Sequence, residues 1–399
     1  MGAHFFSSFR SIDMIRYLSS GESHGPELLG IIEGLPAGLA VTEDAINVDL
    51  FRRQQGYGRG GRMAIEKDTA RIVSGVRWGR TLGSPVGLVV ENRDWANWNE
   101  KMSADPAHVG ALKAVTRPRP GHADLTGMLK YGHSDVRDVL ERSSARETAM
   151  RVAVGAVAKA LLAEFGIRVM GWVTEIGGVA AGEFTGKAAA LYKKAEASRV
   201  RCPDEGASMN MMEAIDRAKA DGDSLGGVFQ VTVAGCPPGL GSYAQRDRTL
   251  DGLLAGAMMS IQAMKGVEVG MGFAVARVPG SAVHDEIFYS KAKGYYRKTN
   301  NAGGIEGGMS NGSDIVIRVA MKPIPTLYRP LQSVDVTDKK PFKASVERSD
   351  SCAVPAAAVV GEAVAAFVIA QAMTEKFGGD CVVDMKAAYD AYMERVREF

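Results

Sequence analysis

The sequence has few of the residues that build a disulfide framework or a metal site. Only four cysteines, Cys202, Cys236, Cys352 and Cys381, occur among 399 residues, and no two of them form a CxxC pair. No histidine stands near them at the spacing of a zinc site. The pattern argues against a disulfide-stapled fold, predicts no metal centre, and is typical of a protein of the reducing cytoplasm.

The sequence also lacks an excess of either charge. The 48 basic and 46 acidic side chains give a formal net charge of +2. No global field is therefore available to hold a nucleic-acid backbone or an anionic membrane surface. We expect neither nucleic acid nor a membrane as a partner, and any anion site has to be built locally.

Long hydrophobic runs are absent apart from residues 353–373. That run reaches the ~20 residues that a bilayer core requires, but Glu362 lies in its middle and Pro355 near its start. Its alanine and valine residues suit a helix packed on all sides inside protein. The apolar run near the N-terminus is too short for a signal peptide. We interpret residues 1–13 as a disordered extension and residues 14–399 as a single domain.

Periodicity predicts a mixture of strands and buried helices. Alternating or β-branched runs predict strands at residues 14–20, 28–33, 69–76, 85–91, 168–176, 227–234, 267–278 and 314–321. Thr42 can cap a helix that ends before Gly56. Further helices are predicted at residues 145–165, 247–264 and 353–377, and their apolar character on nearly every face implies burial between layers.

A faint internal repeat accompanies two of these helices. Glu141-Arg142-Ser143 precedes a helix with Val154-Gly155, and Glu347-Arg348-Ser349 precedes another with Val360-Gly361 at the same spacing. Two copies of one substructure would explain the repeat, although helices rich in alanine and valine also produce such similarity by chance.

The segment FRRQQGYGRGGRM, which starts at Phe51, alternates arginine with glycine. Guanidinium groups match phosphate and carboxylate geometry, and glycine permits close approach of the backbone to a ligand. We interpret residues 52–62 as part of an anion site, while a solvated basic loop stays an equal alternative on this segment alone. The formal GxGxxG pattern follows a helix and not a strand, so it does not predict a dinucleotide site.

Other segments could also carry chemistry. TRPRPGHAD presents Arg119 and His122 on a backbone stiffened by prolines. His24 follows a strand, and Glu22 and Ser23 beside it could orient its imidazole for proton transfer, although a lone histidine is more often structural. Arginine and serine before the two buried helices suggest anion sites at helix N-termini, or ordinary caps. The glycine-rich NNAGGIEGGMSNG could line a cofactor or form a plain hairpin.

Three segments resemble the signature regions of the chorismate synthase family: GESHGPELLGIIEGLP from Gly21, ERSSARETAMRVAVGAVA from Glu141, and RSDSCAVPAAAVVGEAV from Arg348. The blocks RRQQGYGRGGRM, RPGHADL, SIQAMKGVE, GGIEGGMSNG and KPIPT follow the family's order. The resemblance spans Met14 to about Phe377. It implies an α+β fold, a single-domain β-α-β sandwich with long buried helices between two antiparallel sheets.

The resemblance also implies a reaction. The family's enzymes are carbon–oxygen lyases that eliminate phosphate in an anti 1,4 sense from 5-enolpyruvylshikimate 3-phosphate to give chorismate, the last step of the shikimate pathway. They require reduced FMN, which is not consumed overall, and they form homotetramers. NADPH would act as an indirect reductant, and a separate flavin reductase is an expected partner.

Site residues are carried over by position. Those expected to hold the substrate anions are Arg53, Arg59, Arg62, Arg119, Arg146 and Arg348, and Arg53 and Arg59 are also expected NADP contacts. Those expected to contact FMN are Arg142, Ser143, Ser144, Gln262, Ala263, Gly307, Lys322, Pro323, Ile324, Pro325, Thr326 and Arg348. The resemblance gives catalytic roles to His24 as proton donor to the leaving phosphate, His122 near flavin N1, and Asp350 in deprotonating flavin N5.

Two other classes of function stay open at this point. One is a flavin reductase or another FMN-dependent oxidoreductase, and the other is an RNA-binding protein of the RGG type, which the single RGG-like copy without interleaved aromatics disfavours. Residues 182–224 match none of the family's blocks.

Overall fold

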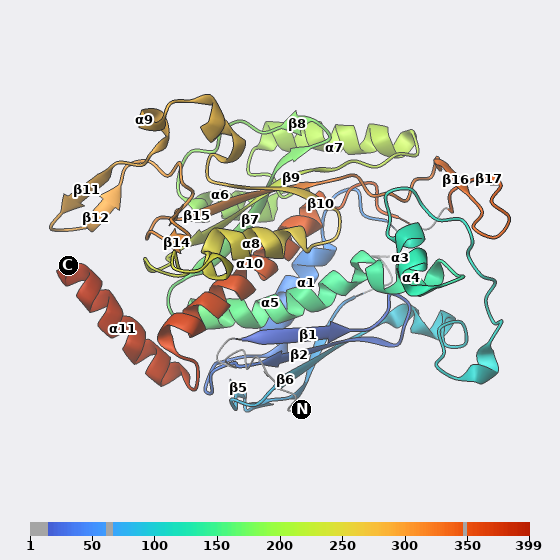
Figure 1. Ribbon diagram of the computed structural model, residues 1–399, viewed down its shortest axis with the longest axis horizontal. Coiled ribbons are helices and arrows are strands. Elements are labelled where there is room, and N and C mark those ends of the chain that lie inside the picture. Colours follow the sequence, from blue (N-terminus) through green and yellow to red (C-terminus); the bar gives the residue numbers. More distant parts are fainter. Residues whose placement is uncertain (1–14, 61–66, 346–348) are drawn as a thin grey trace, which may run out of the picture.

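Two antiparallel sheets enclose a layer of helices in the computed structural model of the chain (Figure 1), which describes residues 15–60, 67–345 and 349–399. The expected N-terminal extension, residues 1–13, lies outside these described residues. One continuous core cluster includes residues from both sheets and from the helices between them, for example Leu28, Met150 and Val231. The predicted α+β sandwich is confirmed.

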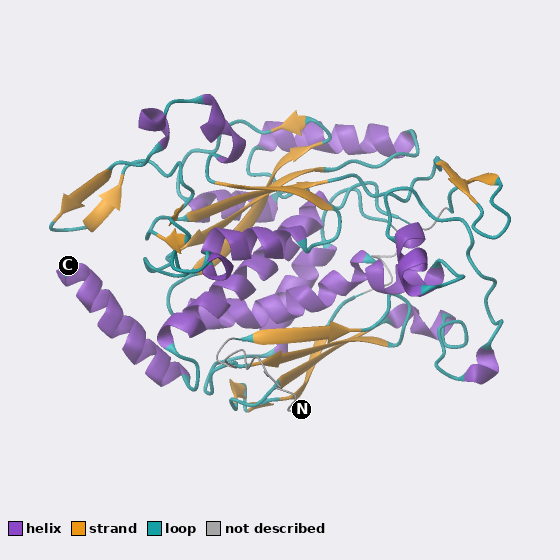
Figure 2. Ribbon diagram, in the orientation of Figure 1, coloured by secondary structure: helices purple, strands orange, loops and turns teal. Residues whose placement is uncertain are grey.

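The first sheet has the order β1 (Arg16–Ser20), β2 (Glu27–Glu33), β6 (Val86–Glu91), β3 (Ala70–Ser74), with every neighbouring pair antiparallel. Buried and exposed side chains alternate along β2, so that Leu28 and Ile32 are buried while Leu29 and Ile31 are exposed. Such alternation buries one face of a sheet and leaves the other uncovered. The helical layer covers the buried face (Figure 2).

The second sheet has the order β10 (Met264–Val269), β15 (Ile315–Met321), β9 (Gly227–Ala234), β7 (Arg168–Ile176), β8 (Val179–Ala180), and it is also antiparallel. Two further amphipathic helices pack on this sheet, α6 (Ala188–Ala197) on β7 and α7 (Glu205–Ala220) on β7 and β8. The buried Trp172 of β7 packs with Ala195 of α6. Residues 182–224 therefore form a helical cover on this sheet.

The central layer consists of α1 (Glu43–Gln54), α5 (Thr148–Ala163), α8 (Leu250–Met259) and α10 (Val354–Phe377). Helix α5 packs on the first sheet and α10 on β7 and β9 of the second. Within the described residues, α10 alone is long and apolar enough to cross a membrane, and 94% of its most apolar 18-residue window is buried. It is the core helix of the sandwich.

The two halves of the chain repeat one pattern of elements. The first half runs β1, β2, α1, β3, β6, α5, and the second runs β7, β9, α8, β10, β15, α10, if the short β8 and the peripheral elements are set aside. In both sheets the first strand pairs with the second, the second with the fourth and the fourth with the third. The topology supports the duplication that the faint sequence repeat suggested.

Most predicted elements are present with shifted ends. Thr42 caps α1, since its Oγ1 accepts a hydrogen bond from Ala45 N at 3.2 Å. The strand predicted at residues 267–278 is wrong beyond Val269, because Gly270 and Gly272 take positive φ values of 59° and 55° and the chain turns into a 3-10 helix at Gly272–Arg277. Residues with positive φ cannot continue a strand.

The remaining elements are short or peripheral. The helices are α3 (Asp124–Tyr131), α4 (Arg137–Ser143), α9 (Gly280–Val283) and α11 (Val382–Glu398). The further 3-10 turns are Arg93–Asn97, Pro106–His108, Ala145–Glu147 and Arg246–Arg248. The short strands are β4 (Val76–Arg77), β5 (Arg80–Thr81), β11 (Ile287–Ser290), β12 (Gly294–Arg297), β13 (Ile305–Glu306), β14 (Met309–Ser310), β16 (Gln332–Val334) and β17 (Pro341–Lys343).

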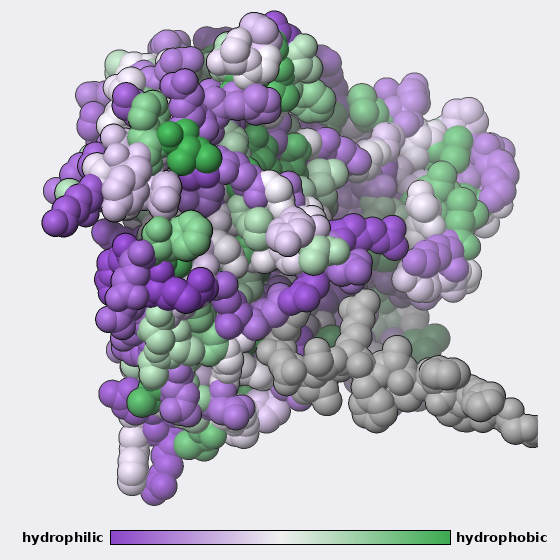
Figure 3. Space-filling view, turned by 60° about the vertical axis from the view of Figure 1, so that its left-hand side comes forward, coloured by the Kyte–Doolittle hydropathy of each residue, from purple (hydrophilic) through white to green (hydrophobic). Residues whose placement is uncertain are grey.

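On the side that carries β11, β12 and α11, hydrophobic and hydrophilic surface alternate in small patches (Figure 3).

Candidate functional site

A cluster of buried arginines lies where α1 ends and α5 begins. Arg53, only 5% exposed, donates from Nε to Thr148 Oγ1 and from Nη2 to the carbonyl of Ala145, each at 3.0 Å. Its Nη1 lies 3.3 Å from Asp68 Oδ2. The other oxygen of Asp68 lies 2.5 Å from Nη1 of Arg146. One buried carboxylate thus joins two of the predicted substrate arginines.

The electrostatics place a third arginine in the same cluster. Burial and the positive charges of Arg59 and Arg146 lower the pKa of Arg53 to about 10. The negative charge of Asp68 opposes this shift. Like charges lower the pKa of a cation only when they are close. Three guanidiniums therefore converge, and an added anion would relieve their repulsion.

The glycine loop that carries Arg59 rests on the start of α10. Ser351 N donates to Gly58 O at 2.8 Å, and Asp350 accepts from Gly60 N at 2.6 Å and from Arg59 Nη1 at 2.8 Å. A Cβ on Gly60 would lie 2.8 Å from Ser349 O. The glycines in this part of the loop are therefore required by close packing within the chain, where the sequence suggested close approach to a ligand.

The segment without family motifs, residues 182–224, supports this loop from the other side. The hydroxyl of Tyr57 lies 2.8 Å from both carboxylate oxygens of Asp216 on α7, and Tyr57 N donates to Arg199 O at 2.8 Å. A Cβ on Gly58 would lie 3.0 Å from Ile215. Helix α7 thus fixes the loop that presents Arg59.

Arg52, the first residue of the predicted anion segment, is not in the cluster. Its guanidinium pairs with Asp49, Glu196 and Glu362 at distances of 2.5 to 2.7 Å. Successive residues of a helix point about 100° apart, so Arg52 and Arg53 at the end of α1 face different partners. The expectation that the anion site includes Arg52 is wrong, because three carboxylates already neutralise it within the core.

His24 is oriented by a residue that the sequence interpretation did not select. Glu141 accepts from His24 N at 2.8 Å and lies 2.9 Å from His24 Nδ1. Burial works to raise the pKa of Glu141, but the hydrogen bonds from His24 and Arg137 lower it below its usual value. Glu141, and not the exposed Glu22, therefore orients the imidazole. Ser23 Oγ lies 3.2 Å from Ser144 Oγ, which ties this loop to the start of α5.

His122 has a similar environment. Its Nδ1 contacts Asp124 Oδ1, and Asp124, fully buried, accepts from Arg119 Nε at 2.8 Å and Nη2 at 3.0 Å. Burial opposes these bonds, yet hydrogen bonds from His122 and Arg119 lower the pKa of Asp124. Arg119 Nη1 donates to Thr326 Oγ1 at 3.0 Å. The guanidinium of Arg119, an expected substrate ligand, is thus bound to Asp124 in this structure.

Most residues expected at the flavin lie along one connected surface. Gln262 Nε2 donates to Glu147 Oε2 at 3.0 Å, Lys322 N donates to Ala263 O at 3.0 Å, and Lys322 Nζ contacts Gly121 O beside His122. Arg142 donates to Ser19 O at 2.8 Å. Residues 322–326 therefore bring the histidine loop next to the end of α8.

Gly307 lies apart from this surface. It occupies the turn of the hairpin β13–β14, and the neighbouring Gly308 accepts from Leu250 N at the start of α8. Gln262 follows the other end of α8, which is about 15 Å long at 1.5 Å per residue. The glycine-rich segment thus forms the plain hairpin, and the fold of one chain does not bring Gly307 to the other expected flavin contacts.

Several polar groups are suited to a flavin phosphate or ring. Among the residues that the structure describes, Ser143 Oγ and Gln262 Oε1 are buried without a hydrogen-bond partner. Burial and the nearby charge of Lys265 lower the pKa of Lys322. Buried polar atoms are normally satisfied, and paired ammonium groups favour an anion between them. The residues present therefore fit a flavin mononucleotide.

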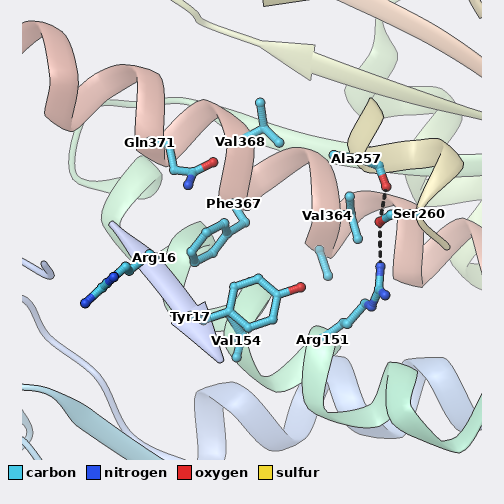
Figure 4. Close-up of a pocket in the computed structure, with 11 residues that line it drawn as sticks. Arg16, Tyr17, Arg151, Val154, Ala257, Ser260, Val364, Phe367, Val368 and Gln371 are labelled. Carbon is cyan, nitrogen blue, oxygen red and sulfur yellow. Dashed lines mark hydrogen bonds between the residues drawn. The ribbon is translucent and has the colours of Figure 1, made fainter. Parts of the chain in front are cut away.

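A separate cavity of about 240 Å³ opens between β1, α5, α8 and α10 (Figure 4). Tyr17 and Phe367 meet edge to face at its wall, with ring centroids 4.8 Å apart. Arg151, its inner cation, pairs with Glu147 at 2.9 Å and donates to Ser260 Oγ at 2.7 Å. Since this cation is already neutralised, the cavity is a poorer site for a multiply charged anion than the arginine cluster.

Contacts link the loop of His24 to Ser144, the loop of His122 to Lys322 and Thr326, and the arginines Arg53 and Arg146 to the segment that follows Ser144. Arg59 and Asp350 pair with each other at the start of α10. Arg62 and Arg348 lie outside the described residues. Sequence reasoning missed Asp68 and Glu141 as partners. Glu141 opens a quoted motif, so its position was visible, but nothing in the sequence indicated what it contacts.

Comparisons with known proteins point to one family. A family model described as Chorismate synthase matches residues 15–374. A chorismate synthase of Geobacter sulfurreducens is 60% identical over 393 residues, covering 97% of this chain and 100% of that protein. One of Pelobacter propionicus is 61% identical over 391 residues, covering 96% and 100%. A solved structure described as a crystal structure of chorismate synthase has 44% identity and a TM-score of 0.79, and the match covers 98% of this chain and 100% of that one.

Proposed function

The chain belongs to the chorismate synthase family, and from that premise we propose how its own residues carry out the lyase reaction that completes the shikimate pathway. The reaction is the anti 1,4-elimination of phosphate from 5-enolpyruvylshikimate 3-phosphate to give chorismate. The observation that carries the proposal is the set of guanidiniums of Arg53, Arg59 and Arg146 held by Asp68 and Asp350, together with two histidines that are each bound by a carboxylate.

The arginine cluster would hold the substrate. The substrate carries one phosphate and two carboxylates, and each charge-assisted hydrogen bond stabilises it by roughly 1.5–3 kcal/mol. In the structure, Asp68 forms ion pairs with Arg53 and Arg146, and Asp350 forms one with Arg59. Substrate binding would therefore exchange some internal ion pairs for bonds to the ligand. Arg62, Arg119 and Arg348 stay predicted members of the same cage.

The histidines would move protons. Loss of phosphate develops negative charge on the departing oxygen, which protonation stabilises. His24 would supply that proton. His122, held by Asp124, would lie at the flavin N1 edge, and Asp350, held between Arg59 and Gly60 N, would accept a proton from flavin N5.

Reduced FMN supplies the electron density that removal of an unactivated C6 hydrogen requires and that no side chain provides. The groups that would hold it include Ser143, Gln262 and residues 322–326, with Arg142, Ser144 and Ala263 beside them. NADPH would act indirectly through a separate reductase, because the sequence has no convincing pyridine-nucleotide fingerprint. Contacts of Arg53 and Arg59 with NADP stay a prediction.

The proposed assembly is a homotetramer. The outer face of the first sheet exposes Leu18 to 77%, Leu29 to 43%, Ile31 to 53% and Val73 to 50%. Leu18 pairs with Ile31 across β1 and β2, so these apolar side chains are neighbours on one face. An uncovered apolar patch of this kind favours contact with another protein surface, here a second copy. The contact of Gly307 with FMN stays a prediction.

The proposed compartment is the cytoplasm. All four cysteines are unpaired in the structure, and Cys202, Cys236 and Cys352 are buried thiols. Unpaired cysteines are typical of proteins in reducing compartments.

Variants separate binding from chemistry. Arg59→Ala should chiefly raise KM for 5-enolpyruvylshikimate 3-phosphate, whereas His122→Ala and Asp350→Ala should lower kcat far more than flavin affinity. Arg248→Ala is the matched control, since Arg248 pairs with Glu375 outside the cluster. Steady-state assays under reducing conditions with flavin titrations measure both quantities. The reverse pattern would show that the roles are wrongly assigned.

A further inference from the structure

The hydrogen bonds of Glu141 with His24 and Arg137 together define the state of His24. Its Oε2 accepts from His24 N at 2.8 Å, and its Oε1 lies 2.9 Å from both His24 Nδ1 and Arg137 Nη1. Glu141 is only 3% exposed. The backbone also joins the two segments, because Ser23 N donates to Glu141 O at 2.9 Å. The loop and the helix α4 are therefore locked together at this point.

The chemistry of these groups decides which ring nitrogen carries the proton. An ionised carboxylate only accepts hydrogen bonds, and Arg137 keeps Glu141 ionised. Nδ1 of His24 must then be the donor, since a lone pair on Nδ1 would face the carboxylate oxygens. Nε2 is the remaining nitrogen and the one available to a ligand.

The ring plane is fixed as well. The imidazole of His24 stacks on the indole of Trp98, with centroids 4.1 Å apart and planes 28° from parallel. The guanidinium of Arg137 lies 4.9 Å from the centroid of the same indole. Trp98, Glu141 and Arg137 thus leave His24 little freedom to rotate.

His122 shows a related arrangement. Its Nδ1 contacts Asp124, Arg119 holds that carboxylate through two of its nitrogens, and Arg119 Nη2 also lies 3.1 Å from Nδ1. Both histidines are therefore imidazoles bound at Nδ1 by a buried carboxylate that an arginine backs. A chance contact would not be expected to recur at the two histidines that the family resemblance selects.

We propose that Glu141 is the positioning residue for His24, holding Nδ1 protonated and turning Nε2 towards the departing phosphate. The inference rests on the proposed role of His24 as proton donor. In that step the C–O bond to phosphate breaks, the leaving oxygen takes the proton from Nε2, and His24 keeps its other proton on Nδ1 against Glu141. The negative charge of Glu141 stabilises the doubly protonated ring before transfer.

Among the described residues, other charged groups also lie near His24, and one of them, Asp94, accepts from Trp98 Nε1 at 3.1 Å. Glu22 stands on the same loop and is exposed. Lys101 lies 5.3 Å from the Trp98 ring centroid. Arg146 approaches indirectly, through Asn92, which donates to the carbonyls of Glu22 and Gly25. Of these groups, Glu141 alone makes a direct hydrogen bond to the imidazole, so its removal should have the largest effect on proton transfer.

The first test is the nuclear magnetic resonance spectrum of the 15N-histidine-labelled protein without flavin or substrate. The His24 signals are assigned by difference from His24→Gln. Above the titration of the ring, the signals should show a proton on Nδ1 and a bare Nε2. A proton on Nε2 with a bare Nδ1 would overturn the proposal, and this measurement needs no variant of Glu141 to fold.

The second test compares Glu141→Gln with the control Glu22→Gln. Glu141→Gln should lower kcat by about 10- to 100-fold, as for other residues that orient a reactive ligand. It should also move the limb of the kcat/KM profile that reports the acid towards lower pH by about one unit or more. Glu141→Asp keeps the negative charge, so the acid limb of its kcat/KM profile should lie close to that of the wild type. The profile of Glu22→Gln should match the wild type.

The outcomes separate the two claims. Wild-type turnover in His24→Ala would refute the proposed role of His24, whatever its tautomer. Loss of turnover in His24→Ala combined with an unmoved pH profile in a folded Glu141→Gln would refute only the role of Glu141.

Discussion

Asp68 is the residue that sets the charge balance of the arginine cluster. Its side chain is fully buried and contacts Arg53 at 3.3 Å and Arg146 at 2.5 Å. In the sequence it is a lone aspartate before a strand, and that pattern usually indicates a surface position. A carboxylate placed between two buried guanidiniums offsets much of their desolvation cost before substrate arrives.

Asp68→Asn should therefore destabilise the free protein and increase its response to substrate. Removing one partner of a buried ion pair costs about 3–5 kcal/mol of unfolding free energy. Substrate anions would replace the missing negative charge, so 5-enolpyruvylshikimate 3-phosphate should raise the Tm of Asp68→Asn more than that of the wild type. Thermal unfolding with and without the substrate measures both effects.

The control for this experiment is Glu213→Gln, whose carboxylate lies 3.7 Å from Arg217 in an exposed pair on α7. It should unfold at the wild-type midpoint. An equal substrate-induced shift in Asp68→Asn and the wild type would contradict a site in which Asp68 and the substrate share the same arginines.

Single residues show where sequence reasoning ends. The pair His122 and Asp124 falls within one short motif, so their proximity followed from spacing. Glu141 lies 117 positions from His24 in the chain, and only the packing of α4 against the first loop brings the two together. Such tertiary contacts leave no local pattern, which is why the carboxylate partners were missed.

At the scale of elements, α5 and α10 meet at a glycine. A Cβ on Gly155 would lie 2.3 Å from Ala363 Cβ and 2.7 Å from Ala363 O. These are distances that real Cβ atoms do not adopt, so the helix backbones are in closest approach here. The site depends on this packing, because the N-terminal ends of both helices contribute to it.

Gly155→Ala should destabilise the protein although alanine is the better helix former. Separating the helices is expected to cost about 1–3 kcal/mol as overpacking, which exceeds the ~1 kcal/mol gained in helix propensity. Gly256→Ala in α8 is the matched control, because open space surrounds its Cβ position. It should stabilise by about 0.5–1 kcal/mol. Chemical denaturation distinguishes the two, and a stabilised Gly155→Ala would contradict the packing.

Elements were predictable where burial dominates. The core helices α5 and α10 and most strands of the two sheets followed from periodicity. The burial expected on nearly every face of the helix at residues 247–264 is wrong for α8, which buries only Leu250, Leu254 and Met258. Helices α6 and α7 were not predicted, since their exposed faces dilute the apolar pattern. The error at residues 270–278 arose from valines that suggested a strand, while two glycines with positive φ end it.

At the scale of the whole molecule, one buried ionic network ties the helical layer to its surroundings. Glu362 of α10, fully buried, contacts Arg52 of α1 at 2.7 Å, Lys159 of α5 at 2.6 Å and Arg201 at 3.5 Å. It also accepts from Gly171 N of β7 at 3.0 Å. The core therefore contains a polar centre that fixes the relative positions of these elements.

The network predicts a specific dependence of stability on pH. Burial works to raise the pKa of Glu362, but Lys159, Arg52 and Arg201 lower it from 4.5 to about 2. The stabilisation is thus fully present above pH 4.5 and is lost as the pH falls towards 2. It amounts to about 3 kcal/mol.

Glu362→Gln should remove that part of the dependence. Its unfolding free energy should be lower than that of the wild type at pH 7, and the difference should shrink as the pH falls below 4.5. Denaturant titrations at a series of pH values measure this difference. A gap between the two proteins that stays constant down to pH 3 would contradict the network.

The repeated topology also belongs to this scale. Two sheets with one strand order, each followed by a long helix, bring the starts of α5 and α10 to the loop that carries Arg59. The sequence repeat indicated the two helices but not the meeting of their ends, because the arrangement of the halves is not a local property.

The most direct test of the central claim uses the purified wild-type protein, chemically reduced FMN and 5-enolpyruvylshikimate 3-phosphate, mixed without oxygen. Phosphate and chorismate are followed together with the absorbance of the flavin. The account predicts that phosphate and chorismate appear in equal amounts over many turnovers, with the flavin still reduced at the end. Phosphate release that does not depend on flavin, or a failure to form chorismate while the flavin stays reduced, would contradict it.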